Sequence, residues 1–157
     1  DDSSRSNYIC LRTNSIKIKC STLIKRLRAQ DIECSSSSNL PDCIYVRTEK
    51  KISDLSLFKS GEFEIQDFGS QLIVRALNVK KHSTVVDFCA GAGGKSLAIG
   101  SLMRNTGLVY SFDISKNKIN IIGNNQYFFL IFKNVKNSIR NFIIKFIYKS
   151  KLSYLEG

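Results

Sequence analysis

Closely spaced glycines offer the clearest chemistry in this chain. Gly91, Gly93 and Gly94 follow an apolar stretch that ends at Asp87, and Lys95 and Ser96 come directly after them. Glycine lets the backbone turn sharply, and it lets an adenosyl or phosphate group approach without a collision with Cβ. Small-molecule cofactors commonly bind at such a loop between a strand and a helix. The spacing therefore predicts a cofactor loop.

A carboxylate follows the loop at a suitable distance. The apolar stretch 108–113 reads as a strand and ends in Asp113, roughly 20 residues beyond the loop, where a βαβ fold places the acid that binds ribose hydroxyls. Asp87 ends the strand before the loop and is a second candidate. We expect Asp113 to contact the cofactor ribose and Asp87 to shape the loop.

The elements that position these residues can be read from apolar spacing. Helices are expected at 95–103 and 70–77, and upstream at 22–29, while strands are expected at 8–19 and 44–47, with serines 35–38 in the loop between them. The resulting division has a small α/β unit at 1–57, a cofactor unit at 58–119 and a tail at 120–157. The predicted fold class is α/β.

Three kinds of cofactor suit such a unit, and the glycine pattern separates them. A nicotinamide fingerprint needs a third glycine where Ser96 stands. A phosphate-binding P-loop fits Gly94, Lys95 and Ser96, but its first glycine would fall on Cys89. S-adenosylmethionine (SAM) needs a strand, a small-residue loop and an acid after the next strand, and all three are present in order. A P-loop nucleotide-binding module stays open as a minor alternative.

Three motifs resemble one family. The loop Cys-Ala-Gly-Ala-Gly-Gly-Lys at 89–95 is similar to the Cys-Ala-Ala-Pro-Gly-Gly-Lys loop of the RsmB/NSUN/Nop RNA 5-methylcytosine methyltransferases, from which it departs at two small-residue positions. Residues 61–72 resemble the Gln-Asp and Ser-Gln-Leu segment that precedes that loop. Residues 11–17 resemble, more weakly, the start of the family's RNA-contacting region. The resemblance covers about residues 8–119 and is expected to end there.

This resemblance implies a function and a set of site residues. SAM would donate a methyl group to carbon 5 of a cytosine in ribosomal or transfer RNA. The implied fold is a small RNA-binding-type α/β unit followed by the first half of a Rossmann-like methyltransferase domain. The implied RNA-contacting residues are Arg12, Asn14, Lys17 and Gln66. The implied cofactor-binding residues are Asp87, Cys89, Ala90, Gly91, Ala92, Gly93, Gly94, Lys95 and Asp113.

The family's reaction also needs a catalytic cysteine. A cysteine thiolate adds to C6 of the ring before C5 attacks the methyl group, and in the family it lies downstream of the position that matches Asp113. No cysteine follows Cys89 here, so we assign no catalytic residue and expect no methyl transfer by this chain alone. We therefore expect the chain to be a truncated or degenerate fragment of such an enzyme. A complementary chain could supply the missing catalytic half. The alternative is a non-catalytic, basic RNA-binding remnant.

The composition indicates where the positive charge lies and which kinds of protein the chain does not resemble. The formal net charge is +11, of which residues 1–113 carry +4 and residues 114–157 carry +7. The segment 114–157 contains eight Lys or Arg residues and one acidic residue. Apolar residues at helical spacing in 135–147 predict a basic amphipathic helix. The five cysteines lack metal-ligand spacing, and neither a signal peptide nor a membrane-spanning run is evident. We therefore expect a cytoplasmic location and no bound metal.

Overall fold

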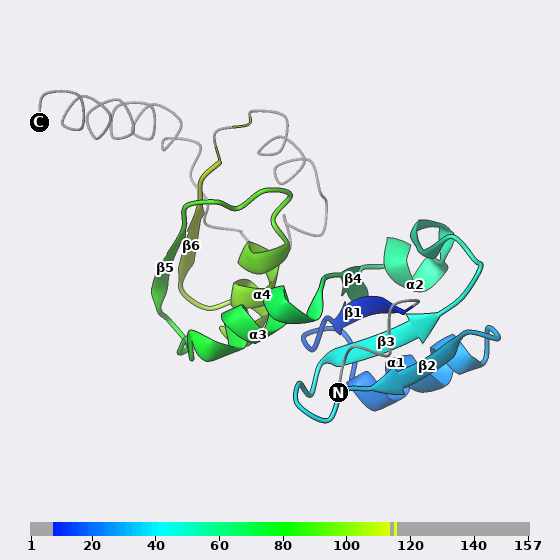
Figure 1. The fold of residues 1–157 in the computed structure, drawn as a ribbon. Helices are drawn as coiled ribbons and strands as arrows, with labels where there is room; N and C mark the ends of the chain where they lie inside the picture. Colours follow the sequence, from blue (N-terminus) through cyan, green and yellow to red (C-terminus); the bar gives the residue numbers. More distant parts are fainter. Residues whose placement is uncertain (1–7, 114, 116–157) are drawn as a thin grey trace, which may run out of the picture.

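The computed structural model describes residues 8–113 and 115. Two α/β units lie side by side in it (Figure 1). The tail predicted at 120–157, with its amphipathic helix at 135–147, lies outside the described residues.

The first unit is an antiparallel sheet with strand order β2-β3-β1-β4. Its elements are β1 (Ile9–Thr13), α1 (Cys20–Arg28), β2 (Glu33–Ser36), β3 (Cys43–Arg47), η2 (Ile52–Asp54), α2 (Ser56–Lys59) and β4 (Phe63–Ile65). The strand expected at 8–19 is therefore shorter, because residues 15–17 form a turn and α1 begins at Cys20. Sequence reasoning missed β2, whose Ser35 and Ser36 were expected in a loop.

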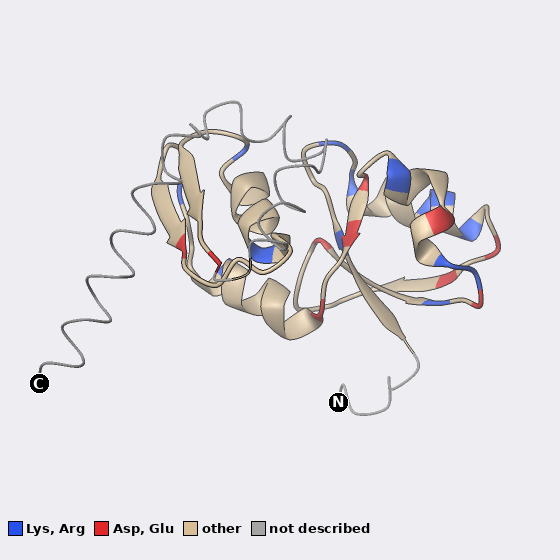
Figure 2. Cartoon of the chain, turned by 90° about the horizontal axis from the view of Figure 1, so that it is seen from above, with Lys and Arg blue, Asp and Glu red and all other residues tan. Residues whose placement is uncertain are grey.

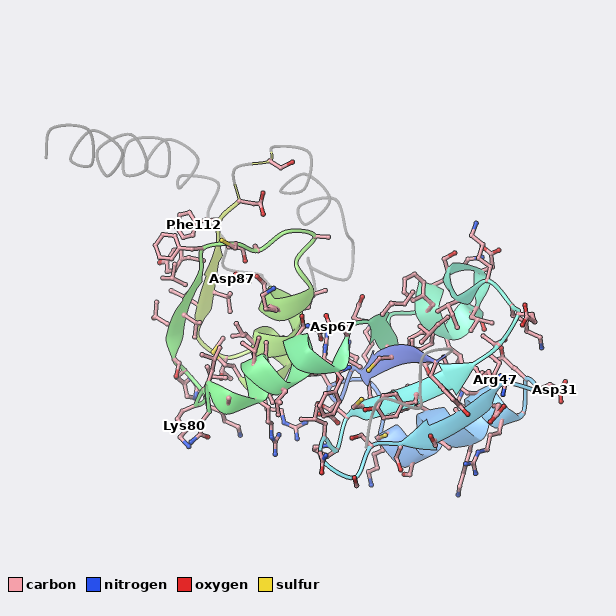
Figure 3. The ribbon with its side chains drawn as sticks, viewed as in Figure 1. Asp31, Arg47, Asp67, Lys80, Asp87 and Phe112 are labelled. Carbon is pink, nitrogen blue, oxygen red and sulfur yellow. The ribbon has the colours of Figure 1, made fainter. Side chains whose placement is uncertain are left out.

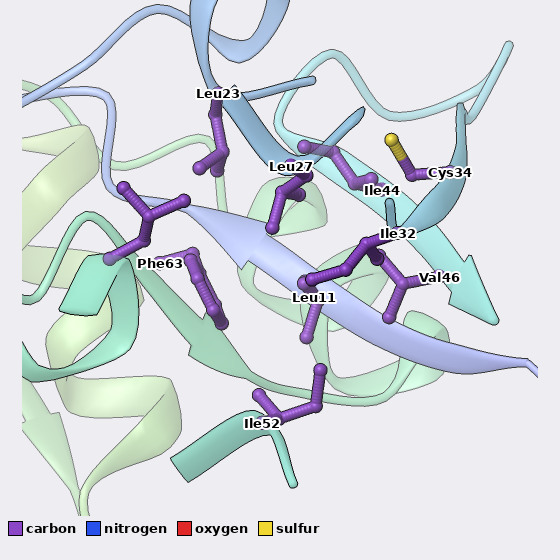
Figure 4. Close-up of a cluster of buried hydrophobic side chains, with 10 residues drawn as sticks. Leu11, Leu23, Leu27, Ile32, Cys34, Ile44, Val46, Ile52 and Phe63 are labelled. Atoms are coloured by element: carbon purple, nitrogen blue, oxygen red, sulfur yellow. The ribbon is translucent and has the colours of Figure 1, made fainter. Parts of the chain in front are cut away.

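Alternation along the strands divides the apolar side chains of the first unit between the two faces of the sheet. Ile44 and Val46 of β3 pack with Leu11, Leu23 and other residues into one core, which Figure 4 shows in close-up. The remaining members of that core are Leu27, Ile32, Cys34, Ile52, Leu57 and Phe63. Cys43 and Tyr45 point to the opposite face. There, Tyr45 stacks on Phe68 with ring centroids 6.4 Å apart.

The first sheet extends past the boundary expected at about residue 57. Strand β4 pairs with β1 in antiparallel register, with Leu11 opposite Ile65 and Thr13 opposite Phe63. The segment that resembles the family's Gln-Asp motif thus begins inside the first sheet. We propose that the two units meet near Gln66, directly after β4.

The second unit is a βαβ arrangement preceded by a helix. Its elements are α3 (Phe68–Ala76), β5 (Thr84–Asp87), α4 (Gly94–Leu102) and β6 (Leu108–Ser111). Strands β5 and β6 are parallel, and both helices lie on one face of them (Figure 1). The core between these layers contains Val74, Ala98, Ile99, Met103 and Val109. The helices expected at 70–77 and 95–103 and the strand expected at 108–113 are present within two residues at each end.

Polar contacts join the two units. Gln71 of α3 is buried, and its Nε2 donates to Gln66 O at 2.8 Å and to Leu11 O at 3.3 Å. On the other side of the junction, the Ser15 and Ser101 hydroxyls are 3.3 Å apart, and Arg104 Nη1 donates to Ser15 O at 3.3 Å. These contacts join α3 to β1 and to the end of β4, and they join the end of α4 to the turn that follows β1.

Candidate cofactor site

Asp87 connects the start of the glycine loop to both strands of the second unit. Its Oδ2 accepts a hydrogen bond from Ser96 Oγ at 2.7 Å, and its Oδ1 accepts one from Cys89 N at 3.3 Å. Ser111 Oγ in turn donates to Ser96 Oγ at 2.7 Å. Figure 3 labels Asp87 where β5 leads into the loop. This carboxylate therefore holds the loop, the first turn of α4 and the end of β6 together.

The same contacts bear on the P-loop alternative. A P-loop uses the hydroxyl of its final Ser or Thr to bind Mg²⁺ at the phosphates. Here Ser96 is fully buried, and its hydroxyl is bound to Asp87 and Ser111. A hydroxyl in that position does not face a ligand at the loop, so the geometry counts against a triphosphate site.

The loop itself turns at two left-handed positions. Gly91 has φ +57° and Gly93 has φ +93°, a region that glycine enters without the steric cost that Cβ imposes. The turn is held by Ala90 N, which donates to Phe112 O at 2.9 Å, and by Gly93 N, which donates to Ala90 O at 2.8 Å. A Cβ placed on Gly91 would meet no heavy atom of the described residues within 4 Å. The loop thus has open space beside Gly91, as a bound cofactor requires.

Asp113 reaches the loop from the strand that follows it. Its Oδ2 accepts from Gly91 N at 2.8 Å, and its Oδ1 accepts from Ser115 N at 2.8 Å. The group therefore orients the loop, and a carboxylate is the type of acceptor that binds ribose hydroxyls at this position of a βαβ unit.

The first turn of α4 presents backbone donors to the loop. The amide groups of Gly94, Lys95 and Ser96 stand where a helix has no intrahelical acceptor, and no side chain of the described residues caps this end. The helix dipole adds a partial positive charge there. This end of α4 therefore favours an anionic group, as the carboxylate of SAM is.

The residues predicted to contact RNA are mostly in the interior. Arg12, Asn14 and Gln66 are each at most 7% exposed. Asn14 Nδ2 donates to Gly61 O at 3.0 Å, and Arg12 Nε donates to Gln66 Oε1 at 2.8 Å. Lys17 Nζ donates to Ser60 O at 2.6 Å in an exposed position. RNA contact by these four residues stays a prediction, and only Lys17 presents its cation at the surface.

Comparisons with known proteins agree with the loop geometry. A family model described as "16S rRNA methyltransferase RsmB/F" matches residues 74–137, a range that contains the whole loop and Asp113. The chain is also 38% identical over 112 residues to the probable ribosomal RNA small subunit methyltransferase B of Bacillus subtilis. Over these residues the chain is similar to the RsmB/NSUN RNA 5-methylcytosine methyltransferases.

Solved structures show the extent of this RsmB/NSUN-like fold. A methyltransferase homologue from Pyrococcus horikoshii superposes with a TM-score of 0.71 at 25% identity, over 85% of this chain and 43% of that one. The NSun6 structure from the same organism, determined with SFG, gives a TM-score of 0.72 at 17% identity over 80% and 56% of the two chains. The mixed α/β fold thus resembles the N-terminal part of RsmB/NSUN structures.

The comparisons also show what the chain covers. It spans about a quarter of the length of the Bacillus subtilis relative, since the match covers 71% of this chain and 25% of that protein. The family match reaches residue 137, which is beyond residue 119, where the resemblance was expected to end. Among the residues that the structure describes, no helix is long and apolar enough to cross a membrane.

Sequence reasoning missed several residues of this RsmB/NSUN-like site. Ser96 and Ser111 support Asp87, but isolated serines carry no signal until the fold brings them together. Phe88 and Phe112 directly follow β5 and β6, and their rings stack at 5.3 Å with an interplanar angle of 19°. Phe88 is 62% exposed despite its size. Each of the two parallel strands is followed by an aromatic residue, at the edge where such sheets bind ligands. That pattern is the sequence signal that could have identified Phe88 and Phe112 as site residues.

Proposed function

We propose that this chain carries the cofactor-binding part of a SAM-dependent RNA (cytosine-5) methyltransferase. The observation that carries the proposal is the carboxylate of Asp113, which comes from the end of β6 and accepts a hydrogen bond from Gly91 of the glycine loop. A carboxylate in this position, beside the glycine loop, suits the ribose of the adenosine part of SAM. The names of the matching family and of the Bacillus subtilis relative support ribosomal RNA as the substrate class, and a relative named as a tRNA (cytosine(72)-C(5))-methyltransferase keeps transfer RNA within the proposal.

Each part of the loop has a definite role in this proposal. Asp113 accepts hydrogen bonds from the ribose hydroxyls, while the first turn of α4 and Lys95 attract the carboxylate of the amino-acid end. Gly91 leaves room for the ligand, and Asp87 keeps the loop in shape through Ser96. When bound, SAM supplies the electrophilic methyl group. The residues described here bind and orient the cofactor, and no nucleophile is assigned among them.

Calorimetric titration with SAM tests this proposal. We expect the wild-type chain to bind SAM and the Asp113→Asn variant to bind it at least about tenfold more weakly, because an amide replaces a charged acceptor with a weaker one. Glu49→Gln is the matched control, because it removes an exposed acid that lies in a turn of the first unit. Equal affinities for all three proteins would refute the role of Asp113, and an absence of SAM binding by the wild type would refute the proposal.

A second candidate is a basic RNA-binding module without cofactor. Helix α1 favours it, because the helix carries Lys25, Arg26 and Arg28 in its last turn and no acid in its first. However, Arg26 forms an ion pair with Glu62 at 2.7 Å, and Figure 2 shows acidic segments interspersed with basic ones over the first unit. RNA binding that occurs without SAM binding, and that weakens steeply with added salt, would favour this module.

A further inference from the structure

A buried amide without a partner lies beside the first turn of α4. Gln66 is 6% exposed, and its Nε2 has no hydrogen-bond partner among the described residues. A buried polar group of this kind costs about 1–3 kcal/mol when it is left unpaired. Such a cost is worth explaining, because native proteins pair nearly all of their buried polar groups.

The orientation of this amide follows from its other contact. Arg12 Nε donates to Gln66 Oε1 at 2.8 Å. A guanidinium has no acceptor, so the oxygen of the amide must face Arg12 and the nitrogen must face the other way. Burial lowers the pKa of Arg12, while the negative charges of Glu64 and Asp42 raise it. The buried guanidinium thus holds the amide in one orientation.

The nitrogen points at the glycine loop. A Cβ built on Gly94 would lie 3.7 Å from Gln66 Nε2 and would meet no other heavy atom of the described residues within 4 Å. The described residues therefore leave space on this side of Gly94, and Gln66 Nε2 borders that space. Gly94 is also the first residue of α4, and the amide groups at the N-terminus of a helix favour an anion.

The carboxylates of the second unit accept hydrogen bonds from the protein itself. Asp87 accepts from Ser96 and Cys89, and Asp113 accepts from Gly91 and Ser115. Asp67, next to Gln66, caps α3 through Ser70 N at 2.8 Å, and hydrogen bonds from Ser70 together with the weaker effect of Lys95 hold the pKa of Asp67 below its usual value. None of these hydrogen bonds uses the backbone donors at the start of α4, where no side chain of the described residues caps the helix.

We infer that Gln66 is a ligand-binding residue whose Nε2 donates to an anionic oxygen held at the start of α4, and that Arg12 is the positioning residue that aims it. This inference rests on the proposed function in one respect, because it identifies the anion with the carboxylate of SAM. A phosphate oxygen has the same chemistry, and the choice of ligands below separates the two sources.

Gln66→Glu is the variant that isolates the donor. The new carboxylate still accepts from Arg12, and a negative charge near the start of α4 is compatible with the helix dipole, so the thermal unfolding midpoint should not fall. The donor is lost, however, and a negative oxygen faces the ligand anion. We expect SAM to bind at least about tenfold more weakly, whereas adenosine, which lacks the carboxylate, should bind with unchanged affinity.

Gly94→Ala provides a second variant with a different mechanism. Its methyl group would fill the space beside Gln66 Nε2 at an ordinary contact distance, and alanine favours a helix more than glycine does. We expect a protein at least as stable as the wild type, with weakened SAM binding and unchanged adenosine binding. This variant keeps the inference testable if Gln66→Glu does not fold.

Calorimetry with SAM, adenosine and ADP then distinguishes the possible outcomes. Selective loss of SAM affinity in either folded variant supports the inference, and unchanged SAM affinity in both variants overturns it while the proposed function stands. If the wild type binds ADP and not SAM, and the variants bind ADP more weakly, the inference stands and the proposed function fails. If the wild type binds none of the three ligands, both fail.

Discussion

At the residue scale, the hydroxyl of Ser96 is the most constrained group of the site. Its Oγ donates to Asp87 and accepts from Ser111, both at 2.7 Å, in a fully buried position. Replacing one partner of a buried hydrogen bond to a charged group leaves that charge without its donor, which costs more than the loss of a neutral bond. The shape of the loop therefore depends on a side chain that is buried in the interior.

We predict that Ser96→Ala lowers the free energy of unfolding by about 1–3 kcal/mol, as measured by urea denaturation. Ser111→Ala is the matched control, because it removes one donor to Ser96 and leaves the bond to Asp87 in place. Its effect should be smaller. An equal or larger loss in Ser111→Ala would mean that Asp87 does not depend on the Ser96 hydroxyl.

The candidate residues of the cofactor loop were easier to predict from the sequence than the burial of the residues around them. The glycine loop, Asp87 and Asp113 could be found from spacing, because the strand-loop-helix pattern is local in the sequence. Arg12, Asn14 and Gln66 were expected at an RNA surface, but they lie in the interior. Their burial results from the pairing of β4 with β1, which joins segments about fifty residues apart and leaves no local signal.

At the element scale, helix α3 begins with a cap that should respond to pH. Asp67 accepts from Ser70 N at 2.8 Å, and hydrogen bonds from Ser70 lower the pKa of this carboxyl. A carboxyl with a lower pKa in the folded than in the unfolded state stabilises the fold fully above the unfolded value of about 3.9. That contribution is lost as the pH falls through the folded pKa.

We predict that Asp67→Ala lowers the free energy of unfolding by about 1 kcal/mol at pH 7. The difference from the wild type should shrink as the pH is lowered below about 4, and thermal unfolding across this range measures it. Asp67→Asn keeps an uncharged cap, so it should retain most of the stability without the acid-dependent loss. A difference between wild type and Asp67→Ala that does not change with pH would contradict this account.

The turn into β6 gives a second prediction at this scale. Gly107 has φ +81°, and a Cβ there would lie 2.2 Å from Ser83 O, which accepts from Leu108 N. Because the clash is with backbone, Gly107→Ala must displace the start of β6. Gly91→Ala is the matched control, with φ +57° and no heavy atom of the described residues within 4 Å of its Cβ.

We expect Gly91→Ala to cost about 1–2 kcal/mol, which is the strain of the left-handed conformation alone. Gly107→Ala should cost clearly more, because overpacking is added to the same strain. Thermal unfolding of both variants measures the difference. Similar midpoints for the two proteins would show that the backbone near Ser83 yields easily.

At the scale of the whole molecule, Gln71 holds the units in their mutual orientation. Its buried amide donates to Gln66 O, to Leu11 O and, at 3.3 Å, to Cys10 Sγ. We predict that Gln71→Leu lowers the free energy of unfolding by about 1–3 kcal/mol and increases hydrogen exchange at both β1 and α3. Gln30→Leu, a change at a partly exposed turn, is the control. Faster exchange in only one of the two units would contradict this linking role.

The division of the chain shows the limit of local patterns at this scale. The tripeptide Phe63–Ile65 is too short to be recognised as a strand, and its sequence neighbours belong to the family's second motif. Its place was decided by Phe63, whose fully buried ring completes the core beneath β1. The boundary that apolar spacing predicts near residue 57 therefore lies between strands of one sheet.

That short strand also governs how the protein can be divided in the laboratory. If the first unit were produced alone and ended at residue 57, β1 would lose the partner that covers one side of it. Its free N–H and C=O groups would form an open edge, which is the usual template for aggregation between chains. A version that ends after Gln66 keeps β4 on this side of β1, and we expect this longer piece to stay in solution.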